Sequence, residues 1–156
     1  MAHVTTNLKR NVYADRFRGY KQALADHDIP FDEHLLVINS LSEETSTEAA
    51  QMILKMDPIP DGIFAANDPA AVSCIRELKR AGIKIPEQIA VGGFNNDPFS
   101  RVIEPDLTTI NYPGHEMGEA AVSTLIRRLD KQEGASLNTM VLRHQLIVRE
   151  SSLRKK

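Results

Sequence analysis

The stretch from Gly62 to Asn96 constrains the fold more than any other part of the chain, because it has the pattern of one strand–helix–strand unit. Its first residues, GIFAA, form a short apolar run of the length of a buried strand. Asp68 is placed to cap a following helix with its side-chain oxygen, and Pro69 suits the first helical turn, where an N–H group is not needed. Gly82 then predicts the end of that helix.

A second apolar strand is expected over residues 89–94, directly after the helix. Two strands joined by a single helix should be parallel, with a right-handed crossover. Asn67 follows the first strand, and Asn95 and Asn96 follow the second. In open α/β sheets, ligands bind outside the carboxyl ends of the strands. The unit therefore predicts both a fold class and the sheet edge at which a site should lie.

The residues before this unit continue the same alternation of strands and helices. We expect strands over 1–5 and 35–38, and helices over 12–26 and 43–56, the second one beginning at Ser42. The predicted buried face of the helix over 43–56 consists of Ala49, Met52, Ile53 and Met56. Short connections between alternating strands and helices are typical of an α/β protein with a doubly wound parallel sheet that helices cover on both faces.

After the central unit the pattern changes. An extended segment over 107–112 leads into a helix over 113–130, and a polar turn is expected over 131–138. Alternating side chains predict a long strand over 140–149, and the basic residues 154–156 predict a frayed, solvated end.

Composition excludes several classes of function. A chain of 156 residues with 42% hydrophobic residues supports one ordinary domain with a real core. Its formal net charge of −2 argues against a nucleic-acid-binding surface spread over the whole chain. No apolar run approaches the ~20 residues of a membrane span, and the first residues lack the apolar stretch of a signal peptide. The single cysteine, Cys74, fits a reducing, cytoplasmic setting.

Motif searches do not predict an enzyme. The chain has no phosphate-binding loop, no dinucleotide-binding glycine pattern and no zinc-protease motif. Cys74 lies in mid-helix, where a packed thiol is expected rather than a nucleophile, and no spacing pairs Ser73 or Ser100 with a catalytic histidine. We expect no metal and no cofactor. The histidines share no metal-ligand spacing and are expected at surface or hydrogen-bonded positions: His3, His27, His34, His115 and His144.

Polar residues at the strand ends are the best candidates for a binding site. Asn67 and Asn95 carry side chains that both donate and accept hydrogen bonds, which suits hydroxyl-bearing ligands. Arg16 lies near the start of the first helix, at the same edge of the sheet. The alternatives are turn chemistry for each asparagine and, for Arg16, a surface ion pair with Asp15 or a neighbouring chain. Convergence of all three residues on one rim favours a site.

Several stretches resemble the effector-binding domain of lactose/galactose-repressor-type bacterial transcription regulators. They occur in the family's order over nearly the whole chain, and four in register make the resemblance specific. The stretches are ADRFRGYKQAL at 14–24, DGIFAANDPAAVSCIRELKRAGIKIPEQIAVGGFNN at 61–96, EPDLTTINYPGHEMGEAA at 104–121 and HQLIVRESS at 144–152.

This resemblance implies two similar α/β lobes, like those of periplasmic sugar-binding proteins, with an effector in the cleft between them. It also implies that the chain is a fragment, since the family carries a helix-turn-helix and most of the first lobe ahead of the strand that begins here. Residues 1–110 with 139–150 would form the C-terminal lobe, 111–138 the crossover and a helix of the other lobe, and 151–156 a tail.

The family's ligand residues can be carried over one at a time. Its helix arginine falls on Arg16 and its strand-end asparagine on Asn67. Asn95 stands where the family usually has an aspartate, which puts a simple neutral hexose in doubt. Tyr112 takes the place of a usual glutamine, and Asp68 is expected to cap its helix rather than touch ligand. The remaining expected wall residues are Phe94 and Phe99.

The function implied is effector sensing in a homodimeric, cytoplasmic repressor that binds a sugar or sugar derivative, and that contacts DNA only through a helix-turn-helix absent from this chain. A periplasmic-type solute receptor of a transport system is the alternative with the same fold, and a small doubly wound enzyme is a third. Without its own lobe, the helix over 113–130 would leave Met117, Ala121 and Leu125 uncovered, so we expect self-association, a swap or altered packing there.

Overall fold

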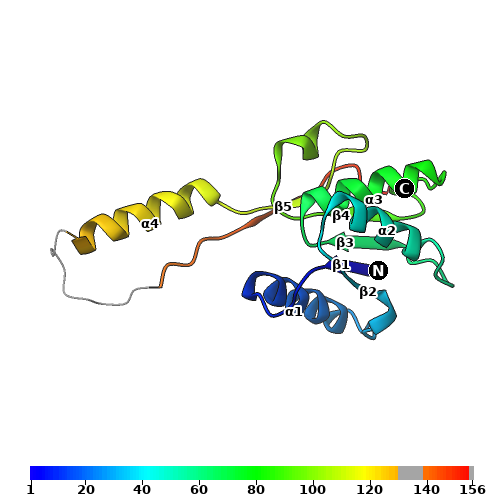
Figure 1. Cartoon of the computed structure of the whole chain (residues 1–156), viewed down its shortest axis with the longest axis horizontal. Helices are drawn as coiled ribbons and strands as arrows, with labels where there is room; N and C mark the ends of the chain where they lie inside the picture. Colours follow the sequence, from blue (N-terminus) through cyan, green and yellow to red (C-terminus); the bar gives the residue numbers. More distant parts are fainter. Residues whose placement is uncertain (130–138, 155–156) are drawn as a thin grey trace.

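Four parallel strands form the central sheet of the computed structural model, which describes residues 1–129 and 139–154 (Figure 1). The sheet order is β2-β1-β3-β4, and Val4 of β1 lies between Val37 of β2 and Ala65 of β3. The predicted α/β class and parallel pairing are therefore confirmed. The strands are β1 (Ala2–Thr5), β2 (Leu36–Ile38), β3 (Gly62–Ala65) and β4 (Ala90–Gly92).

Helices cover both faces of this sheet. Helix α1 (Asn11–Asp26) lies on one face, and α2 (Glu43–Ile53) and α3 (Asp68–Arg80) lie on the other (Figure 1). The main core forms between the sheet and the α2–α3 pair, where long aliphatic side chains are almost completely buried. They include Val4, Ile53, Ile63, Leu78 and Val91.

Local signals place the helix ends largely as expected. The Ser42 side chain accepts a hydrogen bond from the Thr45 N–H at 3.2 Å, which caps α2. Gly82 follows α3 with a φ of +78°, a conformation that glycine adopts without a steric penalty. The predicted buried face of α2 is wrong at Met52, which is 55% exposed, because the face that packs on the sheet runs through Ser46, Ala49, Ala50 and Ile53.

A two-stranded antiparallel ribbon leads away from the sheet. It consists of β5 (Thr109–Asn111) and β6 (Gln145–Ile147), and its base is bridged to β4 through Gly92 and Thr108. The predicted strand over 140–149 is thus much shorter in the structure. Helix α4 (Gly114–Leu129) follows β5 and projects from the lobe (Figure 1). The remaining elements are two short 3-10 helices, η1 (Glu33–Leu35) and η2 (Pro98–Arg101).

Helix α4 has no buried residue. Its apolar side chains are half or more exposed, among them Met117, Val122, Leu125, Ile126 and Leu129. This is the uncovered apolar side that the sequence predicts for the helix. The polar turn expected over 131–138 lies outside the described residues. Within the described part of the chain, every helix is too short or too polar to cross a membrane.

The chain is fastened to the lobe at Ser151, and Arg154, the one described residue of the predicted frayed end, is exposed but hydrogen-bonded. The Ser151 hydroxyl is buried, donates to the Val91 carbonyl at 2.7 Å and accepts from the Thr108 N–H at 2.8 Å. Arg154 donates to the backbone carbonyls of Pro86 and Asp61. These bonds fasten the returning chain beside β4; residues 155–156 lie outside the described range.

His3 is fully buried on the α1 side of the sheet, and not at the surface. Its ring stacks on Phe64 and Tyr20, with ring centres 4.9 Å apart in both pairs, and its Nδ1 lies 2.9 Å from the Phe64 carbonyl oxygen. Its Nε2 has no hydrogen-bond partner among the described residues, so only one of the two ring nitrogens is hydrogen-bonded. Burial lowers the pKa of His3, and the bond to Phe64 opposes this effect.

We expect the stability of the fold to fall as pH drops below the ordinary histidine pKa of about 6.5, because the folded state binds a proton at His3 less readily than the unfolded state does. His3→Phe keeps an aromatic ring but removes the titration, so its urea unfolding free energy should depend less on pH between 7.5 and 5. The exposed His27, changed to Gln, is the control. An equal pH slope in His3→Phe and the wild type would contradict this.

Gly93 leaves space that Asp68 fills. A Cβ atom built on Gly93 would lie 2.3 Å from the Asp68 Oδ1 atom, whereas one built on Gly19 of α1 meets nothing within 4 Å. We expect Gly93→Ala to lower the free energy of unfolding by about 1–3 kcal/mol through this clash, and Gly19→Ala to leave it unchanged or raise it by up to about 1 kcal/mol. Urea denaturation of the two variants checks this; similar stabilities would contradict it.

Candidate functional site

Arg16 reaches across the carboxyl ends of the central strands. It lies in α1, and its Nη1 donates a hydrogen bond to the Ala66 carbonyl at the end of β3. Its guanidinium carbon lies 3.6 Å from the centre of the Phe94 ring, which follows β4. The ion pair considered for Arg16 does not form, because Asp15 pairs with Arg18 instead. The structure thus brings together Arg16 and Phe94 from two distant parts of the chain.

The charge of Arg16 is balanced by an aromatic face and a carbonyl rather than by a carboxylate. Among the described residues, no carboxylate forms a salt bridge with it. Burial lowers the pKa of Arg16, while Tyr13, Tyr112 and Asp68 act in the opposite direction, and an arginine remains charged at neutral pH. A half-buried cation with spare N–H donors is suited to hold an oxygen-rich ligand.

Asn67, and not Asp68, caps helix α3. Asn67 has extended backbone angles, and its Oδ1 accepts a hydrogen bond from the Ala70 N–H at 2.8 Å. The cap predicted for Asp68 is wrong because the helix begins one residue earlier than Pro69 suggested, which leaves Asp68 already inside the first turn. The sequence predicted turn chemistry as the alternative for Asn67; in the structure its side-chain oxygen serves as a helix cap, and its amide nitrogen remains for other partners.

Asp68 is a buried carboxylate that links three segments. It accepts hydrogen bonds from the Thr109 hydroxyl at 2.6 Å and from the Asp97 N–H at 2.8 Å, and its own N–H donates to the Phe94 carbonyl at 2.9 Å. Burial raises the pKa of Asp68, and the hydrogen bonds from Thr109 and Asp97 act against this rise. Thr109 is a site residue that the sequence pattern does not single out, although a threonine directly beside the apolar Ile110 in an extended segment is a usable signal.

The turn after β4 has an unusual backbone. Asn95 has a φ of +130° and Asn96 a φ of +57°, both in the region that favours glycine. The Asn95 N–H donates to the Ile110 carbonyl at 3.0 Å, and the Asn96 N–H donates to the Thr109 hydroxyl at 3.2 Å. This turn therefore holds Asn95 at the strand ends while fastening it to β5.

The two remaining predicted site residues, Tyr112 and Phe99, are partly exposed and make fewer contacts with the other site residues. Tyr112, just after β5, is 42% exposed and close enough to Arg16 to influence its pKa. Phe99 lies in η2, is 36% exposed and makes no ring contact with Phe94 among the described residues. The ring that does approach Phe94 belongs to His144, with ring centres 6.5 Å apart. From the sequence, His144 is expected at a surface or hydrogen-bonded position, and its spacing gives no sign of this contact.

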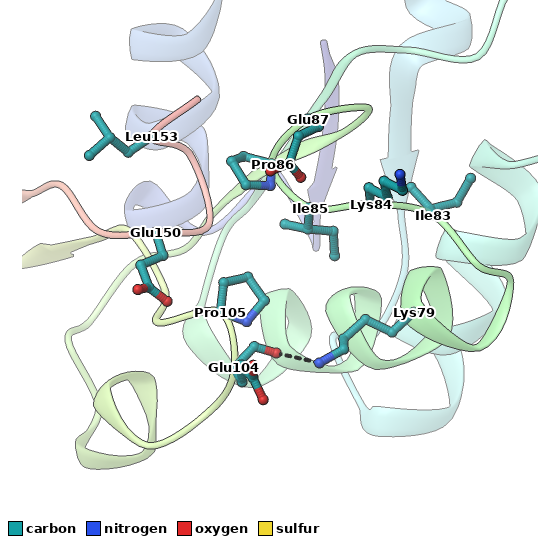
Figure 2. A pocket seen from close by; sticks show the side chains of 10 residues that line it. All are labelled: Lys79, Ile83, Lys84, Ile85, Pro86, Glu87, Glu104, Pro105, Glu150 and Leu153. Atoms are coloured by element: carbon teal, nitrogen blue, oxygen red, sulfur yellow. Dashed lines mark hydrogen bonds between the residues drawn. The ribbon is translucent and has the colours of Figure 1, made fainter. Parts of the chain in front are cut away.

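A separate cavity of about 410 Å³ lies at the opposite edge of the sheet, beside the segment that enters β4. Figure 2 shows that its wall combines aliphatic side chains with lysines and glutamates, and Lys79 donates to the Glu104 carbonyl at 2.9 Å. None of the predicted site residues lines it. The lining residues are Lys79, Ile83, Lys84, Ile85, Pro86, Glu87, Glu104, Pro105, Glu150 and Leu153.

Two other kinds of chemistry, at a metal site or at a reactive thiol, find little support in the described residues. They contain no group of three or more His, Cys, Asp or Glu side chains that could hold a metal ion. Cys74 is fully buried, and burial raises the pKa of its thiol to about 12, so that a reactive thiolate is disfavoured. Its Sγ donates to the Ser46 carbonyl at 3.5 Å, as expected for a packed thiol.

The sequence matches the periplasmic binding protein-like domain family over residues 1–152, and the chain belongs to that family. It is 31% identical to the ribose operon repressor of Haemophilus influenzae over 95% of this chain and 44% of the repressor. It is 36% identical to the transcriptional regulator RegA of Clostridium acetobutylicum over 85% of this chain and 39% of RegA.

Among solved structures, the transcriptional regulator CelR in complex with cellobiose superposes with a TM-score of 0.89 and 27% identity, over 97% of this chain and 46% of CelR. The resemblance to lactose/galactose-repressor-type regulators is thereby confirmed. The chain spans less than half the length of each of these three proteins.

Replacing the α3 cap should reveal a structural role for Asn67 that is separate from ligand binding. Asn67→Ala should lower the free energy of unfolding by about 0.5–2 kcal/mol, because the Ala70 N–H loses its acceptor. Asn67→Asp keeps an accepting oxygen and should stay within a few tenths of a kcal/mol of the wild type. Urea denaturation monitored by circular dichroism measures both variants. Equal losses in the two would contradict the cap.

Proposed function

We propose that this chain senses a small effector within a DNA-binding transcriptional repressor, and that the effector is a sugar or sugar derivative bound at the carboxyl edge of the sheet. The observation that carries the proposal is the position of Arg16, held over the Phe94 ring beside Asn95. An aromatic face, guanidinium donors and a neutral amide form a combination that suits ring-shaped ligands rich in hydroxyl groups.

The relatives support this function. The repressor from Haemophilus influenzae is named for the ribose operon, and CelR was solved in complex with cellobiose, so both names point toward sugars. All of the relatives described above are regulators of transcription rather than enzymes. Because Asn95 is neutral, this site offers the ligand no charged acceptor at the position where an aspartate would supply one. We propose that the ligand contacts six residues: Arg16, Asn67, Asn95, Tyr112, Phe94 and Phe99.

In this proposal, residues 1–110 with 139–150 form one lobe, and 111–138 cross into a second lobe that covers the apolar side of α4. An effector between the lobes shifts their relative orientation only as far as it binds one orientation better than the other. A homodimer in the cytoplasm, with DNA bound through a helix-turn-helix, completes the repressor. Since the second lobe would supply half of the cleft in this proposal, residues 1–156 tested alone should bind the effector only weakly.

Nuclear magnetic resonance titration of the isotope-labelled chain with a panel of sugars, including ribose and cellobiose, tests the site. Amide shifts should cluster at Arg16, Asn67 and Asn95, and Arg16→Ala should abolish them. Arg18→Ala is the matched control, since Arg18 lies on the same helix, is exposed and pairs with Asp15. Shifts that persist in Arg16→Ala, or tight binding by the isolated chain in calorimetry, would contradict the proposal.

A periplasmic-type solute receptor is the second candidate, favoured by the match to the periplasmic binding protein-like family. Sequencing the coding region upstream of Met1 separates the two. A basic helix-turn-helix segment in the same reading frame supports the regulator, whereas a secretion signal supports the receptor. A natural start at Met1 would count against both.

A further inference from the structure

We propose that Asn96 is the positioning residue that couples an occupied effector site to the two crossover strands, β5 and β6. This inference rests on the proposed function, since it concerns regulation of the same site. Asn95 faces the ligand position in that proposal, and its neighbour Asn96 has a different role. Asn96 joins the turn after β4 to both strands of the ribbon that leads to and from α4 (Figure 1).

The side chain of Asn96 bonds in two directions at once. Its Nδ2 donates to the Asn111 Oδ1 at 3.0 Å on β5, and its Oδ1 accepts from the Arg149 Nη2 at 2.8 Å, just after β6. A side-chain amide is a short group that can donate and accept simultaneously, whereas a carboxylate only accepts. An asparagine can therefore donate to the Asn111 side-chain oxygen on β5 and accept from the Arg149 guanidinium after β6 at the same time.

Arg149 extends the link through the base of the ribbon. Its Nη1 donates to the Leu107 carbonyl at 2.7 Å and to the Ser100 hydroxyl at 3.0 Å, and its backbone N–H donates to the Thr108 hydroxyl at 2.8 Å. Arg149, which follows β6, is therefore hydrogen-bonded to the residues that lead into β5. A displacement of Asn96 would act on both sides of the ribbon, because Asn96 bonds to Asn111 on β5 and to Arg149 in the segment that follows β6.

The backbone of the turn adds a second, independent observation. Asn95 and Asn96 are consecutive residues with positive φ, a conformation that costs free energy for residues other than glycine and that clusters at functional sites. Three bonds hold it in place: Asn95 N–H to Ile110, Asn96 N–H to Thr109, and Asp97 N–H to the buried Asp68. The turn is thus clamped between the start of α3 and β5, so that little of it can move without the ribbon.

The inference can be tested on the 156-residue chain with Asn96→Gly, because glycine tolerates the φ of +57° and the change removes only the side-chain link. Asn95→Gly is the matched control one residue earlier, and Asn111→Ala removes the same bond from the β5 end. The readouts are amide hydrogen exchange of the β5–β6 pair Thr109 and Ile147, and amide shifts on titration with ribose and with cellobiose.

Asn96→Gly and Asn111→Ala should speed exchange at Thr109 and Ile147 by about tenfold, with β1 and β3 unchanged, and Asn95→Gly should not. With a binding sugar, Asn96→Gly should keep the shifts at Arg16 and Asn67 but lose those at Leu146, a separation that a purely structural defect would not produce. Unchanged exchange, or undiminished shifts at Leu146, would overturn the inference. If neither sugar shifts any amide, ribose and cellobiose are excluded as ligands of this chain, and the exchange result alone decides whether Asn96 links the turn to the ribbon.

Discussion

The carboxylate of Asp68 is buried where β4, β5 and the start of α3 meet, and much of the site depends on it. Burying a carboxylate is costly unless hydrogen bonds replace the lost water, and here the Thr109 hydroxyl and the Asp97 N–H do so. The absence of a side chain at Gly93 leaves the space that this carboxylate occupies. These contacts hold the turn carrying Asn95 against β5, so the position of a candidate ligand residue follows from a group that is itself inaccessible to ligand.

Arg16 and Asp68 have complementary roles at the same edge of the sheet. Asp68 spends both carboxylate oxygens on internal donors, whereas Arg16 uses one bond to Ala66 and the Phe94 ring to hold its guanidinium in place. One charged group therefore organises the protein and the other remains available to a partner. This division explains why the conspicuous Asn-Asp pair after β3 contributes mainly to architecture: Asn67 caps α3 and Asp68 anchors the crossover.

Helix α4 differs from the rest of the lobe because its apolar side chains are not buried. A single helix of 16 residues gains little stability from its own hydrogen bonds, and most helices in proteins depend on burying an apolar face. Here that face is exposed, and the antiparallel ribbon is the covalent and hydrogen-bonded connection to the lobe. Helix α4 is thus a helix with an uncovered apolar face, attached to the lobe through strands that are bonded to the candidate site.

The sequence by itself determined the alternation of strands and helices, the parallel sheet and the helix limits at Ser42 and Gly82, because apolar periodicity and capping depend on neighbours close in the chain. It also singled out Arg16 and Phe94, but not the contact between them. Only the tertiary structure decided which of Asn67 and Asp68 caps α3, since both residues cap well and the outcome depends on a buried partner on β5. The roles of Asn96, Arg149 and Ser151 likewise depend on segments distant in sequence that meet only when the chain has folded.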